Sequence, residues 1–209
     1  MKKRLIVFAS GNGSNFINIY NKIKINDING EICLLVSNNP DCNAIKFAVD
    51  NKIDFFIYNS HRFPNDQNQN SLIKNIKKFD PDLIILAGYM KKISHNMIDL
   101  FKNKILNIHP SLLPKYGGKG FYGIKVHEYV SKNKDLCTGA TVHFIDYSYD
   151  TGPILLQKKI DIKKGEAPLS IAKKVLKIEH KIYFQAVQLF CDNRIYWENN
   201  KPLIKGQLN

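Results

Sequence analysis

The chain has 209 residues, of which 44 % are hydrophobic, and its formal net charge is +13. This length suits one domain with a sizeable core. No apolar run approaches the roughly 18 residues that a membrane span needs, so we expect no membrane partner. The first apolar run, Leu5–Ala9, is too short for a signal peptide and predicts a buried first strand in a cytoplasmic protein.

The positive charge raises the question of nucleic-acid binding. Only three of the 31 basic residues are arginine, at positions 4, 62 and 194, whereas base reading and bidentate phosphate binding favour arginine. The lysines are spread along the chain, which indicates a solvated surface that attracts anionic small molecules and no specific nucleic-acid partner. The four cysteines lie apart at positions 33, 42, 137 and 191. This spacing predicts free thiols and no metal site.

The first half of the chain alternates β-rich runs with segments of helical apolar spacing. Strands are expected at Leu5–Ala9, Ile32–Val36, Phe55–Tyr58, Leu83–Leu86 and Lys104–Ile108. Helices are expected between them at Asn15–Ile25, Ala44–Val49, residues 72–79 and Ser94–Phe101. This alternation predicts an α/β fold with a Rossmann-like, doubly wound, mostly parallel sheet.

The pattern changes in the second half. We expect a glycine-rich mobile loop at Tyr116–Gly123, a helix around Val126–Val130, strands at Ala140–Ile145 and Ile154–Ile162, and a long amphipathic helix at Leu169–Phe190. The two neighbouring strands predict an antiparallel end to the sheet. We therefore expect a single domain over residues 1–209, with a phosphate-binding half at about 1–104, a catalytic half at about 105–195 and a polar tail at about 196–209.

The most informative stretch is Asn107-Ile108-His109-Pro110, at the end of the strand that begins near Lys104. Residues two apart in a strand share one face, so the Asn107 and His109 side chains should lie together. Pro110 removes a ladder donor and should end the strand. A carboxamide can donate to a developing oxyanion and an imidazole can donate or relay a proton, which makes this pair a candidate catalytic site.

A second candidate site is the stretch from Ser10 to Asn15, Ser-Gly-Asn-Gly-Ser-Asn, which follows the first strand and opens a helix. The glycines permit a tight turn, and a helix N-terminus offers free N–H groups and the positive end of the dipole. The stretch is neither G-x-G-x-x-G nor a Walker A motif. A mononucleotide-like phosphate is the ligand that suits it, and an ordinary capped turn is the alternative.

A third stretch runs from Gly139 to Pro153. Asp150 lies between an apolar strand and a Gly-Pro turn, where a lone aspartate usually caps the turn. Near His109 it would instead favour the charged imidazolium and hold its orientation. His143 is a competing base, but its position within a strand predicts a satisfied core histidine.

These segments in this order resemble the phosphoribosylglycinamide formyltransferase family, which uses 10-formyltetrahydrofolate as cosubstrate. The shared motifs are Ser-Gly-Asn-Gly-Ser-Asn at 10–15, Leu-Ala-Gly-Tyr-Met at 86–90, Asn-Ile-His-Pro-Ser-Leu-Leu-Pro at 107–114, Gly-Ala-Thr-Val-His-Phe at 139–144, Asp-Thr-Gly-Pro-Ile at 150–154 and Glu-His-Lys-Ile-Tyr at 179–183. The resemblance covers residues 4 to about 190. It implies the formyltransferase fold and formyl transfer to glycinamide ribonucleotide in purine biosynthesis.

The resemblance also implies roles for individual residues. Asn107 and protonated His109 would stabilise the tetrahedral oxyanion, and Asp150 would sustain the charge on His109. The substrate phosphate and ribose would be bound by Gly13, Ser14, Asn15 and Glu179. The folate would be bound by Met90, Lys91, Lys92, Ile93, Asn107 and Asp146. Relatives often carry arginine where Lys91 stands, so a bidentate contact to the folate carboxylate is lost.

Other functions remain open at this stage. The chain could be another 10-formyltetrahydrofolate-dependent formyltransferase, a hydrolase of that folate, a noncatalytic nucleotide-binding module or a basic nucleic-acid binder. Folate release that does not depend on the ribonucleotide would indicate the hydrolase. Strongly salt-dependent binding to DNA or RNA would indicate the basic nucleic-acid binder. We expect small-molecule substrates and a monomer or homodimer.

Overall fold

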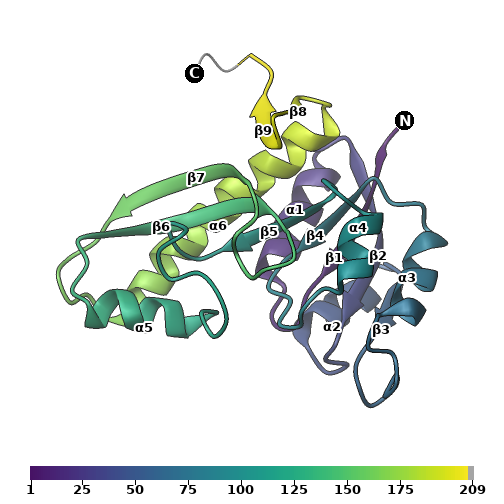
Figure 1. Cartoon of the computed structure of the whole chain (residues 1–209), viewed down its shortest axis with the longest axis horizontal. Helices are drawn as coiled ribbons and strands as arrows, with labels where there is room; N and C mark the ends of the chain where they lie inside the picture. The colour runs from purple at the N-terminus through teal and green to yellow at the C-terminus, as the bar shows by residue number, and fades with distance from the viewer. Residues whose placement is uncertain (207–209) are drawn as a thin grey trace. The chain divides into compact units, whose positions relative to one another are not determined.

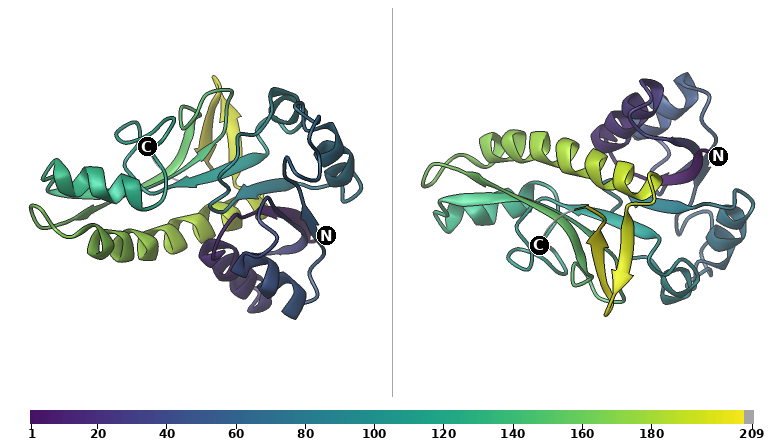
Figure 2. Two further views of the ribbon diagram at one scale, coloured as in Figure 1. Left: turned by 90° about the horizontal axis from the view of Figure 1, so that it is seen from below. Right: turned by 90° about the horizontal axis from the view of Figure 1, so that it is seen from above.

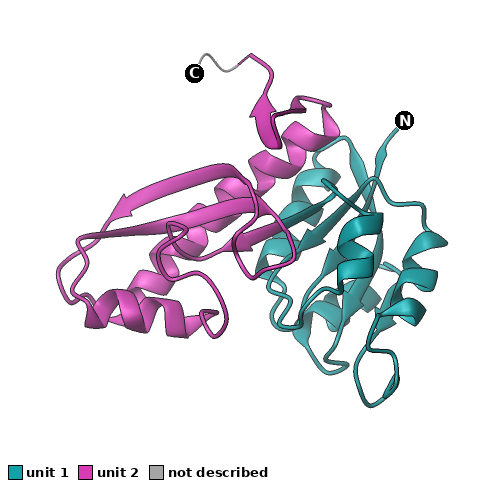
Figure 3. Cartoon of the chain, in the orientation of Figure 1, with its two compact units in different colours: residues 1–106 teal, residues 107–209 magenta. Residues whose placement is uncertain are grey.

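The computed structural model describes residues 1–206. The chain forms two compact units, residues 1–106 and 107–209 (Figure 3). The expected division into halves at about residue 104, within one domain, stays a prediction, and each unit is described separately below.

Unit 1 alternates strands and helices throughout (Figure 1). Its strands are β1 (Lys3–Phe8), β2 (Gly30–Ser37), β3 (Phe55–Ile57), β4 (Leu83–Leu86) and the first two residues of β5 (Ile105–His109). Its helices are α1 (Ser14–Lys24), α2 (Asn43–Asp50), α3 (Asn70–Lys77) and α4 (His95–Leu100). The strand order β3-β2-β1-β4 is parallel at each pair. The predicted α/β class with a mostly parallel sheet is confirmed.

The core of unit 1 lies on β1 and β4. Leu5 pairs with Leu83 and Phe8 with Leu86, and residues 5–8 are fully buried. Strands in the middle of a parallel sheet are covered on both faces, which explains why Leu83–Leu86 is apolar without alternation. Each expected strand and helix of this unit is present, with ends that differ by at most two residues.

Unit 2 contains the end of β5, α5 (Ile124–Lys132), β6 (Cys137–Phe144), β7 (Ile154–Asp161) and α6 (Pro168–Cys191). Strands β6 and β7 pair antiparallel, as predicted. Helix α6 runs along β6 and β7 and beside α5 (Figure 2). A Cβ atom on Gly139 would lie 2.0 Å from the carbonyl oxygen of Lys158, so the tight approach of the two strands requires glycine there.

The segment expected to be a polar tail is structured instead. Strands β8 (Ile195–Glu198) and β9 (Lys201–Ile204) pair antiparallel, and Asn199 and Asn200 between them both have positive φ. A two-residue turn with positive φ at both positions matches the twist of a hairpin, and asparagine tolerates that conformation. The Trp197 ring lies 4.9 Å from that of Phe144, so the hairpin packs on the end of β6.

Within residues 1–206, none of the helices combines the length and the apolar composition required for a membrane span.

Candidate active site

Asn107, His109, His143 and Asp150 come together in unit 2. Asn107 and His109 lie on β5, His143 lies on β6, and Asp150 lies in the turn before β7. Nδ2 of Asn107 is 3.0 Å from Nε2 of His143. Oδ1 of Asp150 is 3.5 Å from Nδ1 of His109 and 3.7 Å from Nε2 of His143. Ile108, between the two β5 side chains, is buried. The structure therefore places Asn107, His109 and Asp150 around one point.

Both ring nitrogens of His109 face oxygen acceptors. Nε2 lies 2.7 Å from the carbonyl oxygen of Tyr116, which can only accept, so Nε2 carries a hydrogen. Nδ1 faces the Asp150 carboxylate. The His109 side chain is 5 % exposed and that of Asp150 is 12 % exposed, so water screens their interaction little. The site therefore offers an acceptor for a hydrogen on each ring nitrogen. A substrate oxygen can accept the Nε2 hydrogen only in place of the Tyr116 carbonyl.

Backbone geometry holds Asp150 in position. Its φ is +58°, a left-handed conformation that aspartate adopts more readily than most residues. Its Oδ2 accepts a hydrogen bond from the backbone N–H of Gly118 at 2.9 Å. A Cβ on Gly117 would lie 3.3 Å from the Asp150 Cβ and 2.6 Å from Leu113, so the loop approaches Asp150 closely only because residue 117 is glycine.

The loop that contacts His109 and Asp150 is anchored at Tyr116. The Tyr116 hydroxyl donates to Oδ2 of Asp135 at 2.8 Å and accepts from Nδ2 of Asn133 at 2.6 Å. Its ring packs on those of Phe121 and Tyr129. The stretch Tyr116–Gly123 was expected to be a mobile loop. Its first residues contact the candidate catalytic pair, because the Tyr116 carbonyl bonds to His109 and the Gly118 N–H bonds to Asp150.

His143 makes a contact that the sequence did not indicate. It is 1 % exposed, and Nδ1 lies 3.0 Å from the carbonyl oxygen of Phe144. Burial lowers the pKa of His143, against the opposing effects of the Phe144 hydrogen bond and the Asp150 charge. The prediction of a satisfied core histidine is therefore confirmed, but one of its partners is the candidate catalytic Asn107. Only the pairing of β5 residues with β6 residues could show this contact.

The other predicted residues of unit 2 lie in two places. Asp146 accepts hydrogen bonds from the Thr151 hydroxyl at 2.7 Å and from the Ser148 N–H at 3.1 Å, so it holds the turn that carries Asp150. Glu179 lies half-buried on α6.

Another buried histidine, His127, lies on α5. Burial, together with the charge of His109, lowers the pKa of His127 to about 4.

The glycine loop of unit 1 has the geometry of an anion site. Gly13 immediately precedes α1 with φ +68°, and within the described residues no side chain caps the helix. A Cβ on Gly13 would lie 2.9 Å from that of Ala44, so the turn requires glycine. The N–H groups in the first turn of a helix have no intrahelical acceptor, and such helix starts commonly bind anions.

The segment predicted to bind folate lies beside this loop in unit 1. The Ser10 hydroxyl accepts a hydrogen bond from the Met90 N–H at 2.9 Å. The Gln69 carboxamide donates to the Lys92 carbonyl and accepts from the Ser94 N–H, both at 2.8 Å, which fixes the backbone there. Met90 is 52 % exposed, and Lys91 and Lys92 are exposed, whereas Ile93 is 5 % exposed. Ile93 can therefore line a ligand only through its backbone. Sequence analysis did not predict these contacts of Gln69 because its two partners lie 23 and 25 residues away.

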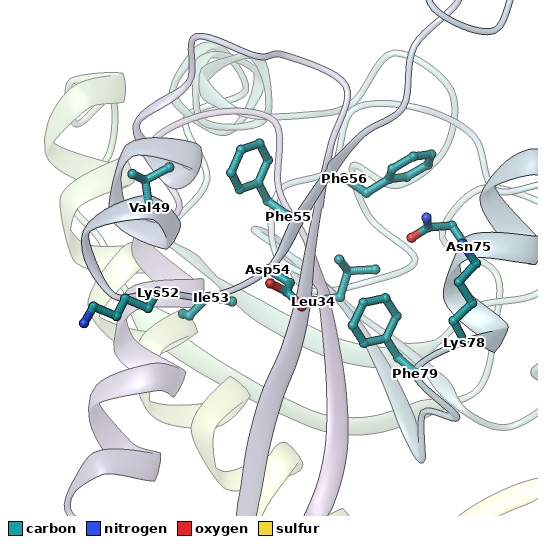
Figure 4. A pocket seen from close by; sticks show the side chains of 10 residues that line it. All are labelled: Leu34, Val49, Lys52, Ile53, Asp54, Phe55, Phe56, Asn75, Lys78 and Phe79. Atoms are coloured by element: carbon teal, nitrogen blue, oxygen red, sulfur yellow. The ribbon is translucent and has the colours of Figure 1, made fainter.

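A cavity of about 570 Å³ lies elsewhere in unit 1 (Figure 4). Its lining comes from β2, β3, the end of α2 and the region of α3: Leu34, Val49, Lys52, Ile53, Asp54, Phe55, Phe56, Asn75, Lys78 and Phe79. None of the predicted site residues contributes to it. Within residues 1–206, no group of three or more His, Cys, Asp or Glu side chains is placed to hold a metal ion.

The sequence matches the formyl transferase family over residues 3–187. The chloroplastic phosphoribosylglycinamide formyltransferase of Arabidopsis thaliana is 40 % identical over 211 residues, which cover 100 % of this chain and 72 % of that protein. The phosphoribosylglycinamide formyltransferase of Escherichia coli strain K12 is 32 % identical, with 97 % and 94 % covered. The phosphoribosylglycinamide formyltransferase of Coxiella burnetii, solved in complex with CHES, superposes with a TM-score of 0.90 at 30 % identity, with 99 % and 95 % covered.

Proposed function

Since this chain belongs to the phosphoribosylglycinamide formyltransferase family, we propose that Asn107, His109 and Asp150 are its catalytic residues. The enzyme transfers a formyl group from 10-formyltetrahydrofolate to the amine of N1-(5-phosphoribosyl)glycinamide in purine biosynthesis. The observation that supports the catalytic assignment is the approach of the Asp150 carboxylate to within 3.5 Å of His109, on the strand that also carries Asn107.

The reaction needs stabilisation of negative charge. The glycinamide nitrogen forms a bond to the formyl carbon, and the carbonyl oxygen becomes an oxyanion. Asn107 donates a hydrogen bond to that oxygen, and protonated His109 donates to it through Nε2 in place of its bond to the Tyr116 carbonyl, while Asp150 keeps His109 charged. The bond from the formyl carbon to N10 of the folate then breaks, and the proton lost by the amine passes to N10 through water. The protein contributes positioning and electrostatics, and no covalent enzyme intermediate or metal is needed in this proposal.

The substrate-binding roles are also proposals. The backbone N–H groups of Gly13, Ser14 and Asn15 would bind the 5′-phosphate, as supported by the uncapped start of α1. Glu179 would bind the ribose hydroxyls.

For the folate, the proposed residues of unit 1 are the exposed segment from Met90 to Lys92 and the backbone of Ile93. The proposed residues of unit 2 are Asn107 and Asp146, which holds the Asp150 turn. We further propose a cytoplasmic enzyme that acts as a monomer or homodimer and has no specific nucleic-acid partner.

An absorbance assay of tetrahydrofolate release tests the assignment. Release should require glycinamide ribonucleotide in the wild-type enzyme, and His109→Ala should lower kcat by about 10²-fold or more, because one oxyanion donor is lost. Release without the ribonucleotide would indicate a hydrolase. Near-wild-type turnover of His109→Ala would rule out the catalytic role of this residue.

A further inference from the structure

Asn107 can act as an oxyanion donor only if its N–H₂ end faces the reacting oxygen. A carboxamide is nearly symmetric in shape, and a half-turn about its last torsion exchanges a donor for an acceptor. Asn107 is only half-buried, so packing alone does not select one orientation. The neighbour that discriminates between the two ends is His143, whose Nε2 lies 3.0 Å from Nδ2 of Asn107.

The tautomer of His143 is set by the main chain of its own strand. Nδ1 lies 3.0 Å from the Phe144 carbonyl oxygen, which cannot donate, so the ring hydrogen is on Nδ1. Nε2 of the neutral ring then carries a lone pair and can only accept. The group that it faces on Asn107 must therefore be the N–H₂ end. A flipped carboxamide would oppose two acceptors and lose the hydrogen bond.

The remaining groups around His143 are consistent with a neutral ring. The charged side chains near it are Asp150, with Oδ1 3.7 Å from Nε2, then His109 and Asp146. A proton on Nε2 would point toward Asp150, but it would displace the hydrogen bond from Asn107. Burial of the ring opposes that charge. Asp150 is consequently left to interact with His109, and His143 remains an acceptor.

We propose that His143 is a positioning residue: its Nε2 accepts one N–H of Asn107 and so directs the second N–H toward the oxyanion. The inference rests on the proposed function, because it assigns His143 an effect only through Asn107. The Phe144 carbonyl on β6 contacts the His143 imidazole, and the imidazole contacts the Asn107 carboxamide. The β6 backbone therefore determines which end of the Asn107 carboxamide faces His143.

The test compares variants that keep or remove the acceptor. Glutamine places an amide oxygen near the position of Nε2, whereas leucine provides none. His143→Leu should lower kcat by about 10-fold to 10²-fold, the range expected when a donor is misdirected, and should change the KM of each substrate by less than about threefold. His143→Gln should recover most of the lost kcat. Equal loss in the two variants, or a loss confined to KM, would overturn the proposal.

A double-mutant cycle separates this role from a merely structural one. Asn107→Ala should lower kcat by about 10²-fold, and adding His143→Leu to it should cost less than about threefold further. Additive losses would show that His143 acts independently of Asn107 and would overturn the positioning role. If Asn107→Ala alone is nearly wild-type, the proposed function of Asn107 fails, which is a distinct result.

Because His143 is buried, its variants could fold poorly, so a measurement on the wild-type protein completes the test. The ¹⁵N spectrum of the histidine side chains, with His143 assigned by comparison with His143→Gln or through its neighbours, should show a neutral ring protonated at Nδ1 at neutral pH. A ring protonated at Nε2, or a charged ring, would overturn the proposal whatever the variants do.

Discussion

Oδ1 of Asp150 lies 3.5 Å from Nδ1 of His109, and both side chains are shielded from water. The same Asp150 is bound through Oδ2 by the N–H of Gly118, and the opposite nitrogen of His109 donates to the Tyr116 carbonyl. One short loop therefore contacts both members of the pair. The relative positions of acid and imidazole are fixed by main-chain groups, which do not change with side-chain rotamer.

Asp150→Asn should lower kcat by about 10²-fold, because the neutral amide no longer stabilises the imidazolium of His109. The KM values should change little, since the substitution is nearly isosteric. Steady-state kinetics on both substrates measure the effect. Asp161→Asn is the matched control, because Asp161 is 87 % exposed on β7 and its variant should behave as wild type. Wild-type turnover of Asp150→Asn would contradict the assignment.

Gly13→Val should raise the KM for the ribonucleotide far more than the KM for the folate. The new side chain clashes with Ala44 in a backbone conformation with φ +68°, which displaces the N–H groups at the start of α1. Gly165→Val has the same φ of +68° but open space around its Cβ, so it separates general backbone strain from a local effect. Equal increases in both KM values would count against phosphate binding by this loop.

Acid should destabilise the protein partly through His127. Its pKa of about 4 in the folded state lies below the ordinary histidine value of 6.5, so the unfolded state binds more protons between these values. Stability from this group is therefore complete above pH 6.5 and is lost as the pH falls toward 4, by up to about 3 kcal/mol. Urea unfolding of the wild type and of His127→Gln at pH 7.5 and 4.5 measures how much free energy of unfolding each protein loses on acidification. The variant should lose less on acidification, and an equal loss would refute the prediction.

Gly152→Ala should destabilise the fold by about 2 kcal/mol or more, because its Cβ would lie 1.9 Å from the Phe144 carbonyl oxygen. Gly152 also follows the Asp150 turn, so kcat should fall as the carboxylate is displaced. Gly11→Ala is the control for stability, since nothing lies within 4 Å of its added Cβ. Denaturant melts and kinetics on the same preparations compare the two; equal midpoints would contradict the prediction.

Much of the fold could be predicted from the chain because its signals are local. The alternation of apolar runs and helical spacing over residues 5–108 predicted the strands and helices of unit 1, and Pro110 correctly predicted that β5 ends at His109. The hairpin β8–β9 was missed although its signal is present. Asn199-Asn200 between Trp197 and Leu203 is a two-residue turn, and it was interpreted as part of a polar tail.

By itself, the sequence determined that Asn107 and His109 share the end of a strand, because side-chain direction in a strand depends only on a period of two. The family resemblance named Asp150 as the partner of His109, but the sequence did not indicate that His143 is the partner of Asn107. Asn107 meets His143 36 residues away, and His109 meets Asp150 across the turn before β7. Such contacts depend on how β5, β6 and the loop pack, a tertiary arrangement that no local period encodes. The tertiary structure therefore decided that His143 is the acceptor for Asn107. It also decided that His109 lies 3.5 Å from the Asp150 carboxylate while its Nε2 donates to the Tyr116 carbonyl.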